Sequence, residues 1–232
     1  QVFGYGHFEP LKHYAEVHLK IEEGARNSGI NFENQASTDD LSQGLQNLVK
    51  QHILVEHRGL LTGSPLTDLK ITLLTGKAHN KHTSGGDFKE ATYRALRQGL
   101  EKAENLLLEP VYDFKIKVDL DYLGKVISDI EKAAGSFESP EINGEQAIIK
   151  GQAPASTFMD YPVELRSFTA DKGIISLKFG GYKLCHNSQE VIKNSNYNKN
   201  KDPEYSSSSI FCSKGKGYTV PWDRAENETH LL

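Results

Sequence analysis

Apolar and polar residues alternate along two stretches in the first third of the chain. Over residues 15–22, apolar side chains occupy every second position between charged residues and a histidine, and residues 68–73 repeat the pattern. A period of two residues predicts β-strands that bury one face and expose the other. The sequence also predicts a turn over residues 24–29 and a short returning strand over 30–32. We treat the residues before position 9 as a short glycine-rich lead-in.

Two further stretches have the three- and four-residue spacing of amphipathic helices. The first runs from Leu41 to Ile53, and the second begins near Asp87 and continues to residue 103. Ser84 lies three residues before Asp87, which predicts a capping arrangement. Together with the strands, these helices predict a compact α+β domain over residues 1–107. The polar face of the second helix is expected to be exposed, and it comprises Lys89, Glu90, Arg94, Arg97, Gln98 and Glu101.

A second domain is predicted over residues 108–185. Strand-like alternation at 112–118 precedes an amphipathic helix that Asp121 is expected to cap, and Asn143-Gly144 marks a hairpin. A helical stretch from Ser156 restarts at Pro162, and a last strand follows over 175–179. The order βαββαβ is that of a ferredoxin-like fold, so the fold class is α+β in both domains.

The remaining residues, 186–232, are predicted to form a C-terminal extension that is partly mobile. Residues 194–209 are poor in apolar side chains and are expected to be a mobile linker. Two segments of strand-forming residues flank Gly215-Lys216-Gly217 and predict a short hairpin. Trp222 is the single tryptophan of the chain, and we expect it to pack back against a domain.

Composition excludes several classes of protein. The formal net charge of −4 argues against a protein that coats nucleic acid with its whole surface. Two cysteines are too few for a disulfide scaffold and suit a cytoplasmic location. No apolar run approaches the roughly 18 residues of a membrane span, and no signal peptide opens the chain. Because the first residue is Gln1, we expect a piece of a longer protein, and we expect it to be monomeric.

The first candidate for a functional site is the loop over residues 75–86, called the tip loop below. Its polar residues, with no apolar anchor among them, are Lys77, His79, Asn80, Lys81 and His82. From residue 77 to residue 97, five Lys and Arg outweigh two acidic residues, which gives a local net charge of +3. Lysine, histidine and asparagine suit contact with irregular RNA, whereas a solvated polar turn is the alternative. Lys89 is the nearest lysine that extends this basic surface.

Two other sets of residues leave alternatives open. Arg166 lies among apolar neighbours on a predicted helix, where it either anchors the sheet edge or reaches a phosphate. The histidines near the first strand suggest acid–base chemistry, but no nucleophile motif accompanies them, and strand alternation alone explains their positions. This second set is His7, His13 and His18 with Glu16.

No metal site is expected from the spacing of the histidines and cysteines. His79 and His82 have no third ligand within sequence range. Cys185-His186 and Cys212 are irregularly spaced and lack a second nearby cysteine, so buried apolar cysteines are favoured over half of a zinc site.

Four segments carry a resemblance to a known family. They are Tyr5-Gly6-His7, residues 73–88, Leu107-Leu108-Glu109-Pro110 and Leu165-Arg166-Ser167-Phe168-Thr169. Together they resemble the C-terminal half of a translational GTPase of the elongation factor G type. The chain is closer still to the relatives that include the tetracycline ribosomal protection proteins. The resemblance covers residues 5–182 with interruptions.

The resemblance implies a fold and a partner. Residues 1–107 would be the fourth domain of such a factor, similar to the second domain of ribosomal protein S5, and residues from 108 would be its fifth domain. The tip loop would enter the ribosomal A site at the decoding region of the small subunit, with His79 in the place of the family's tip histidine. The fifth domain would lean on the large subunit near the GTPase-associated rRNA. Whether the protein moves tRNA or confers tetracycline resistance stays open.

We expect no catalytic residue and no cofactor in this chain. Gly76-Lys77 lacks the upstream glycine and the following hydroxyl of a phosphate-binding loop. The resemblance assigns GTP and Mg²⁺ to the GTPase domain of the full-length protein. The alternative function is a small-molecule enzyme of the metabolite-kinase type on the same S5-like fold. Such an enzyme needs a glycine- and serine-rich phosphate loop, for which Gly63-Ser64-Pro65 is a poor candidate.

Overall fold

The computed structural model describes residues 1–202 and 204–231, and the chain divides into two compact units. Unit 1 comprises Gln1–Asn105 together with Gln189–Leu232, and unit 2 comprises Leu106–Ser188. The extension predicted over 186–232 includes Pro203 and Leu232, which lie outside the described residues. The division differs from the three predicted segments because most of that extension belongs to unit 1.

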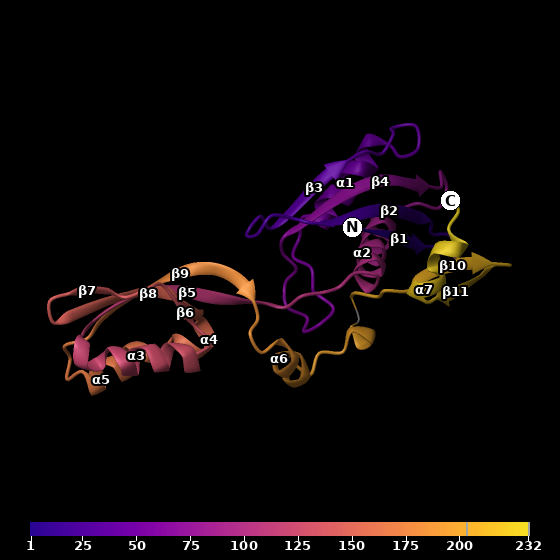
Figure 1. Cartoon of the computed structure of the whole chain (residues 1–232). Helices are drawn as coiled ribbons and strands as arrows, with labels where there is room; N and C mark the ends of the chain where they lie inside the picture. Colours follow the sequence, from indigo (N-terminus) through magenta and orange to yellow (C-terminus); the bar gives the residue numbers. More distant parts are fainter. Residues whose placement is uncertain (203, 232) are drawn as a thin grey trace. The chain divides into compact units, whose positions relative to one another are not determined.

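Unit 1 is built on a six-stranded sheet with the order β11-β10-β1-β2-β4-β3 (Figure 1). Its strands are β1 (Val2–Phe8), β2 (Ala15–Glu23), β3 (Ile30–Asn34), β4 (Leu69–Ala78), β10 (Ser209–Ser213) and β11 (Lys216–Val220). The helices α1 (Gln43–Ile53) and α2 (Gly85–Glu101) pack against each other and against the sheet. The glycine-rich lead-in is therefore a strand, because its glycines face a helix instead of interrupting the pairing.

Two glycines of β1 let α2 approach the sheet closely. A Cβ added to Gly6 would lie 1.9 Å from the carbonyl oxygen of Ala91, and one added to Gly4 would lie 2.0 Å from that of Ala95. Both distances are far shorter than any van der Waals contact, so only glycine fits here. The helix therefore rests directly on the backbone of β1.

The N-terminus of α2 is fixed by the capping arrangement that the sequence predicts. The backbone N–H of Ser84 donates to Asp87 Oδ2 over 2.7 Å, and the capping box is confirmed. The other carboxylate oxygen of Asp87 lies 2.8 Å from His13 Nδ1. A carboxylate in the first turn also favours the positive end of the helix dipole. The buried Asp87 thus joins the start of the helix to the loop before β2.

The expectation of an exposed polar face on α2 is correct for Lys89 but wrong for Arg97 and Gln98. Arg97 is 1% exposed and Gln98 is fully buried. The Arg97 guanidinium donates to the carbonyl of Arg58 over 2.9 Å and to the hydroxyl of Tyr197 over 3.0 Å. Gln98 accepts from the N–H of Tyr5 and donates to the carbonyl of Trp222, each over 3.0 Å. Residues of the C-terminal extension therefore cover the face that periodicity assigns to solvent.

The extension packs against α2 over much of its length. Tyr205 is buried, and its ring stacks on that of Tyr93 with the centroids 5.1 Å apart. Lys199 pairs with Glu101, so the segment predicted to be a mobile linker is in contact with the helix. The hairpin of β10 and β11 is confirmed, and Trp222 is half-buried beside it. The short helices of this part are α6 (Ser188–Asn194), η1 (Lys199–Lys201), α7 (Trp222–Ala225) and η2 (Glu226–Glu228).

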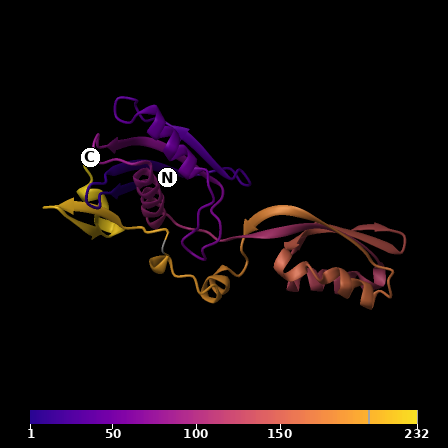
Figure 2. The ribbon, with the colours of Figure 1, turned by 180° about the vertical axis from the view of Figure 1, so that it is seen from behind.

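Unit 2 has the predicted ferredoxin-like order. Its elements are β5 (Leu108–Asp119), α3 (Leu120–Lys132), β6 (Ser136–Phe137), β7 (Glu141–Asn143), β8 (Gln146–Pro154), α4 (Ala155–Phe158), α5 (Tyr161–Phe168) and β9 (Ile174–Leu184). The strand order β6-β8-β5-β9 is antiparallel, and Figures 1 and 2 show the helices gathered on one face of this sheet. Gly144 forms the predicted turn between β7 and β8 with φ +60°. The helix α3 begins one residue before Asp121, its predicted cap.

None of the helices in the described part of the chain is both long and apolar enough to cross a bilayer.

The contact between β1 and α2 generates the first prediction. Gly6→Ala should lower the free energy of unfolding by at least about 2 kcal/mol, because the new methyl group forces the helix off the strand. Chemical unfolding in urea measures the change. Gly44→Ala in α1 is the matched control, since nothing lies within 4 Å of its added Cβ. That control should leave stability unchanged or raise it by up to about 1 kcal/mol. An equal loss in both variants would show that the close approach does not matter.

Candidate nucleic-acid interface

The tip loop is shorter in the structure than the sequence predicts. The strand β4 continues to Ala78 and α2 begins at Gly85, so only residues 79–84 form the turn, called the tip turn below. Lys77 lies on the strand, where it pairs in register with Glu16 of β2. Pairing with β2 extends β4 beyond the predicted strand end, and the capping box starts the helix before Asp87.

Hydrogen bonds within the tip turn close it around Thr83. The N–H of His79 donates to Thr83 Oγ1 over 2.7 Å, and this hydroxyl donates to the carbonyl of Tyr14 over 2.6 Å. The N–H groups of His82 and Thr83 both donate to the carbonyl of His79 over 3.1 Å. The turn is therefore tied to the segment before β2, and its backbone is well satisfied.

The side chains of the tip turn point outward from this frame. His79, Asn80, Lys81 and His82 are all exposed. The imidazoles of His79 and His82 stack with their centroids 4.6 Å apart and an interplanar angle of 24°. The N–H of Lys81 lies 3.2 Å from His79 Nδ1, which then accepts a hydrogen bond and leaves Nε2–H free to donate. The result is a flat, hydrogen-bonding surface flanked by positive charge.

The other predicted basic residues do not all join the tip. Lys89 is exposed on α2, with its ammonium 5.5 Å from the centroid of the Tyr93 ring. Burial and the nearby charge of Lys89 lower the pKa of His52 on α1. The ammonium of Lys89 therefore lies on the side of α2 that faces α1. Arg94, considered as an extension of the basic face, instead donates to the carbonyl of Ser208 over 2.5 Å.

Unit 2 holds Arg166 and a second group of basic residues. Arg166 is exposed on α5, while its neighbour Leu165 is fully buried. On β5, Phe114 faces the core and the alternate residues face away from the helices. That open face of the sheet has a hollow of about 520 Å³ whose lining includes Lys115, Lys150 and Lys178. Lys150 is the cross-strand partner of Lys115, and Lys178 is that of Asp113. Lys150 is paired with Glu141 over 2.7 Å.

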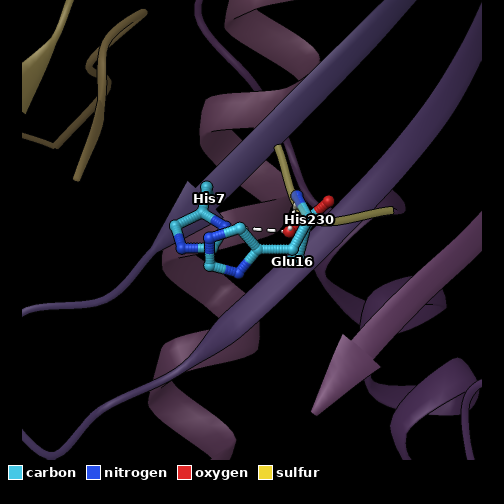
Figure 3. Close-up of side chains that lie close together, drawn as sticks. All are labelled: His7, Glu16 and His230. Carbon is cyan, nitrogen blue, oxygen red and sulfur yellow. Dashed lines mark hydrogen bonds and ion pairs between the residues drawn. The ribbon is translucent and has the colours of Figure 1, made fainter. Parts of the chain in front are cut away.

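A buried polar cluster lies on the opposite side of the unit 1 sheet from α2. His7 Nδ1 is 2.9 Å from Glu16 Oε2, and His18 Nε2 is 2.7 Å from Glu16 Oε1. Strand alternation predicts that this face of β2 is exposed, but Glu16 is fully buried and His18 is 4% exposed. The extension places the ring of Phe211 on that of His7. It also brings His230 next to Glu16, as Figure 3 shows. Nothing near β2 in sequence could signal this cover.

Hydrogen-bond donors stabilise the negative charge of the Glu16 carboxylate. Burial alone would raise the pKa of this carboxyl, but hydrogen bonds from His18, from His7 and from the N–H of His230 outweigh it and hold the pKa well below the usual range. Burial and the negative charge of Glu16 raise the pKa of the Tyr14 hydroxyl. Glu16 is therefore an ionised carboxylate in the interior, stabilised mainly by imidazole donors.

The two cysteines lie in different units. Both are free, and Cys185 belongs to unit 2 whereas Cys212 belongs to unit 1. His186 pairs with Glu109, with 2.8 Å between Nδ1 and Oε1, and does not contribute to a cluster with Cys185.

The comparisons with known proteins agree with this architecture. Residues 5–104 match the family "Elongation factor G, domain IV", and residues 106–192 match "Elongation factor G C-terminus". The boundary between the two matches falls where unit 1 gives way to unit 2, and together they span most of the chain. The chain belongs to the elongation factor G family.

Two curated relatives and one solved structure show the range of the likeness. The chain is 30% identical over 170 residues to the tetracycline resistance protein TetP of Clostridium perfringens, which covers 73% of the chain and 26% of TetP. It is also 30% identical over 170 residues to elongation factor G of Granulibacter bethesdensis, covering 73% and 24%. The chain thus spans about a quarter of the length of these relatives. A crystal structure of a protein from Thermus thermophilus has the same fold, with a TM-score of 0.73 at 22% identity over 84% of this chain and 30% of that one.

The closure of the tip turn generates the second prediction. Thr83→Val removes the hydroxyl that bridges His79 and Tyr14, so the turn should open more often. The amide protons of His79, His82 and Thr83 should exchange with solvent about tenfold faster, which corresponds to a loss of about 1.4 kcal/mol in local stability. Hydrogen exchange followed by mass spectrometry or NMR measures this effect.

The matched control is Thr62→Val, which removes a hydroxyl from another exposed turn of unit 1. This change should leave exchange in the tip turn as it is. Unchanged exchange in Thr83→Val would show that the hydroxyl bridge does not hold the turn.

Proposed function

We propose that this chain is the ribosome-contacting part of a translational GTPase and that the tip turn contacts rRNA in the A site. The observation that supports the proposal is the exposed imidazole and lysine surface at the tip turn, held between β4 and the capped start of α2. The surface belongs to a region that matches domain IV of elongation factor G. The exposed tip surface and the match to domain IV together favour contact with the decoding region of the small subunit.

The chemistry of the tip suits irregular RNA. Lys77 and Lys81 supply charges for phosphate groups, which give affinity without sequence preference. The stacked pair of His79 and His82 offers a flat surface for an unstacked base and ring N–H groups for bases or riboses. Asn80 between them adds an amide that both donates and accepts hydrogen bonds.

The structure around the tip suits a contact that must transmit force. The tip turn is tied to Tyr14 by Thr83, and α2 is packed against β1 on one side and the extension on the other. A surface mounted on such a frame moves with the unit and does not fold back on contact. GTP binding and hydrolysis, with Mg²⁺, belong in this proposal to a GTPase domain of the full-length protein, which acts as a monomer in the cytoplasm.

Unit 2 supplies a second contact in this proposal. Arg166 is exposed on α5 and is positioned to approach phosphate groups. Lys115 and Lys178 lie on the opposite, open face of the sheet, so the proposed second contact is the surface around Arg166. The partner for this surface is rRNA of the large subunit near the GTPase-associated region. The activity of the full-length protein is then translation elongation or ribosomal protection, in line with the names of its relatives.

The alternative, a metabolite-kinase-like enzyme, gains no support from the Gly63-Ser64 loop. A Cβ on Gly63 would lie 2.8 Å from Cδ2 of Tyr197, so the ring of a tyrosine from the extension occupies the space beside this glycine. A phosphate cradle needs backbone N–H groups that are open to the ligand, and here the N–H groups of Gly63 and Ser64 already donate to the carbonyl of Gly59 and to Thr62 Oγ1.

The third prediction tests the tip surface in ribosome binding. Lys77→Ala/Lys81→Ala should weaken binding of the chain to purified ribosomes about tenfold at physiological salt, because two phosphate contacts are lost. The slope of log K against log salt should fall by about 1.4 to 2 in magnitude. Sedimentation of ribosomes with labelled chain at several salt concentrations measures both quantities.

Lys214→Ala/Lys216→Ala is the charge-matched control, since these exposed lysines flank the turn between β10 and β11. His79→Ala/His82→Ala should also weaken binding but leave the salt slope unchanged, because stacking and neutral hydrogen bonds release no counterions. If the tip and control pairs weaken binding equally, net charge and not the tip surface governs the interaction.

A further inference from the structure

Three side chains from distant parts of the sequence converge at the buried polar cluster of unit 1. Figure 3 shows His7 of β1, Glu16 of β2 and His230 of the extension pointing toward one another. One potential ligand atom from each lies within 4.8 Å of the other two. We propose that these residues bind a divalent transition metal, Zn²⁺ foremost, and that the bound metal clips the extension to the sheet.

The donor set suits zinc. Two imidazoles and one carboxylate are borderline ligands that bind Zn²⁺ in tetrahedral sites, with a water molecule completing the coordination. Hard cations such as Mg²⁺ and Ca²⁺ favour all-oxygen sets and are disfavoured here. His7 Nδ1 and Glu16 Oε2 are already 2.9 Å apart, so a small separation of these atoms makes room for an ion bound to both.

Each of the two buried ligands is oriented by a neighbour through its other polar atom. His7 Nε2 lies 3.1 Å from Glu9 Oε2, which leaves Nδ1 as the metal-facing nitrogen. The second oxygen of Glu16, Oε1, lies 2.7 Å from His18 Nε2. A carboxylate behind a ligating histidine, and a hydrogen-bond donor behind a ligating carboxylate, are the usual supports of protein metal sites.

The third ligand is already held next to the other two. The N–H of His230 donates to Glu16 Oε2 over 3.1 Å, and its ring stacks against that of Tyr14 with the centroids 5.9 Å apart. The Tyr14 hydroxyl lies 3.2 Å from His230 Nδ1. His230 is exposed, so a metal ion and its water have access from solvent. When the ion binds, the proton shared by His7 and Glu16 leaves to solvent.

The consequence of metal binding concerns the extension. His230 follows the β10–β11 hairpin, and only the stretch from residue 221 to 229 separates them. A metal bond at His230 therefore fixes the extension at two places, through β10 on the edge of β1 and through the clip on Glu16. Tyr14, which contacts His230, also supplies the carbonyl that anchors Thr83 of the tip turn. The proposal of a metal site does not rest on the proposed RNA contact of the tip turn.

Calorimetric titration of the intact chain with ZnCl₂ after removal of metal by a chelator tests the proposal. We expect one Zn²⁺ per chain with a dissociation constant in the micromolar range or below. His230→Ala should weaken binding at least about 100-fold, a loss larger than removal of a supporting residue gives. Because His230 is exposed, this variant should fold, which circular dichroism checks. Glu16→Gln should have the same effect, and His18→Ala a smaller one.

The matched control is His79→Ala/His82→Ala, which removes the other close pair of histidines in unit 1. This control should bind Zn²⁺ like the unmodified chain. A second readout is limited proteolysis of the extension, which Zn²⁺ should slow in the unmodified chain but not in His230→Ala. Co²⁺ in place of Zn²⁺ should give the visible absorption of a four- or five-coordinate site.

Three outcomes would overturn the proposal. They are binding weaker than millimolar, binding that survives His230→Ala, and binding that the tip double variant abolishes.

Discussion

The packing of α2 between β1 and the C-terminal extension is the constraint on which unit 1 depends. On one side, Gly4 and Gly6 let the helix rest on the backbone of β1. On the other side, Gln98 connects the N–H of Tyr5 to the carbonyl of Trp222, and Arg97 connects two further segments. A buried polar group without its partner costs about 1–3 kcal/mol, so helix, first strand and extension are stable only together. The position of the tip surface is well defined because these contacts hold α2, which begins beside the tip turn, in place.

Local sequence patterns predict most elements but miss what covers them. The capping box at Asp87 and the β10–β11 hairpin follow from turn chemistry, because the residues that form them are close in sequence. The ferredoxin-like unit pairs strands that are far apart in sequence, and it is predicted from the order of its strands and helices. The buried state of Arg97 and Glu16 depends on residues 100 and 214 positions away. A charged residue on the polar face of a helix or strand is predicted to be exposed unless the segment that covers it is known. Here the composition of the covering extension is in part that of a mobile linker.

The same limit applies to the candidate sites. The exposed residues at the tip, His79 to His82, are contiguous, so the sequence identifies them directly. The match to domain IV of elongation factor G supports the partner that we propose, which residue chemistry alone leaves open. The cluster of His7, Glu16 and His230 has no such signal, because the spacing of metal-ligand motifs is only informative when the ligands share one loop or helix. Assembly of the sheet is what creates this cluster.

The parallel pairing of β1 with β10 places Phe8 opposite Ile210. All of unit 2 is inserted between these two positions, so the ribosome synthesises and releases the inserted unit before the last strands of the unit that surrounds it. During translation, the edge of β1 and the polar residues of α2 have no partners in the extension until unit 2 has been synthesised. Contacts of such long sequence separation form late. A nascent chain of this kind exposes an unpaired strand edge, which is a hazard for aggregation until synthesis reaches the hairpin.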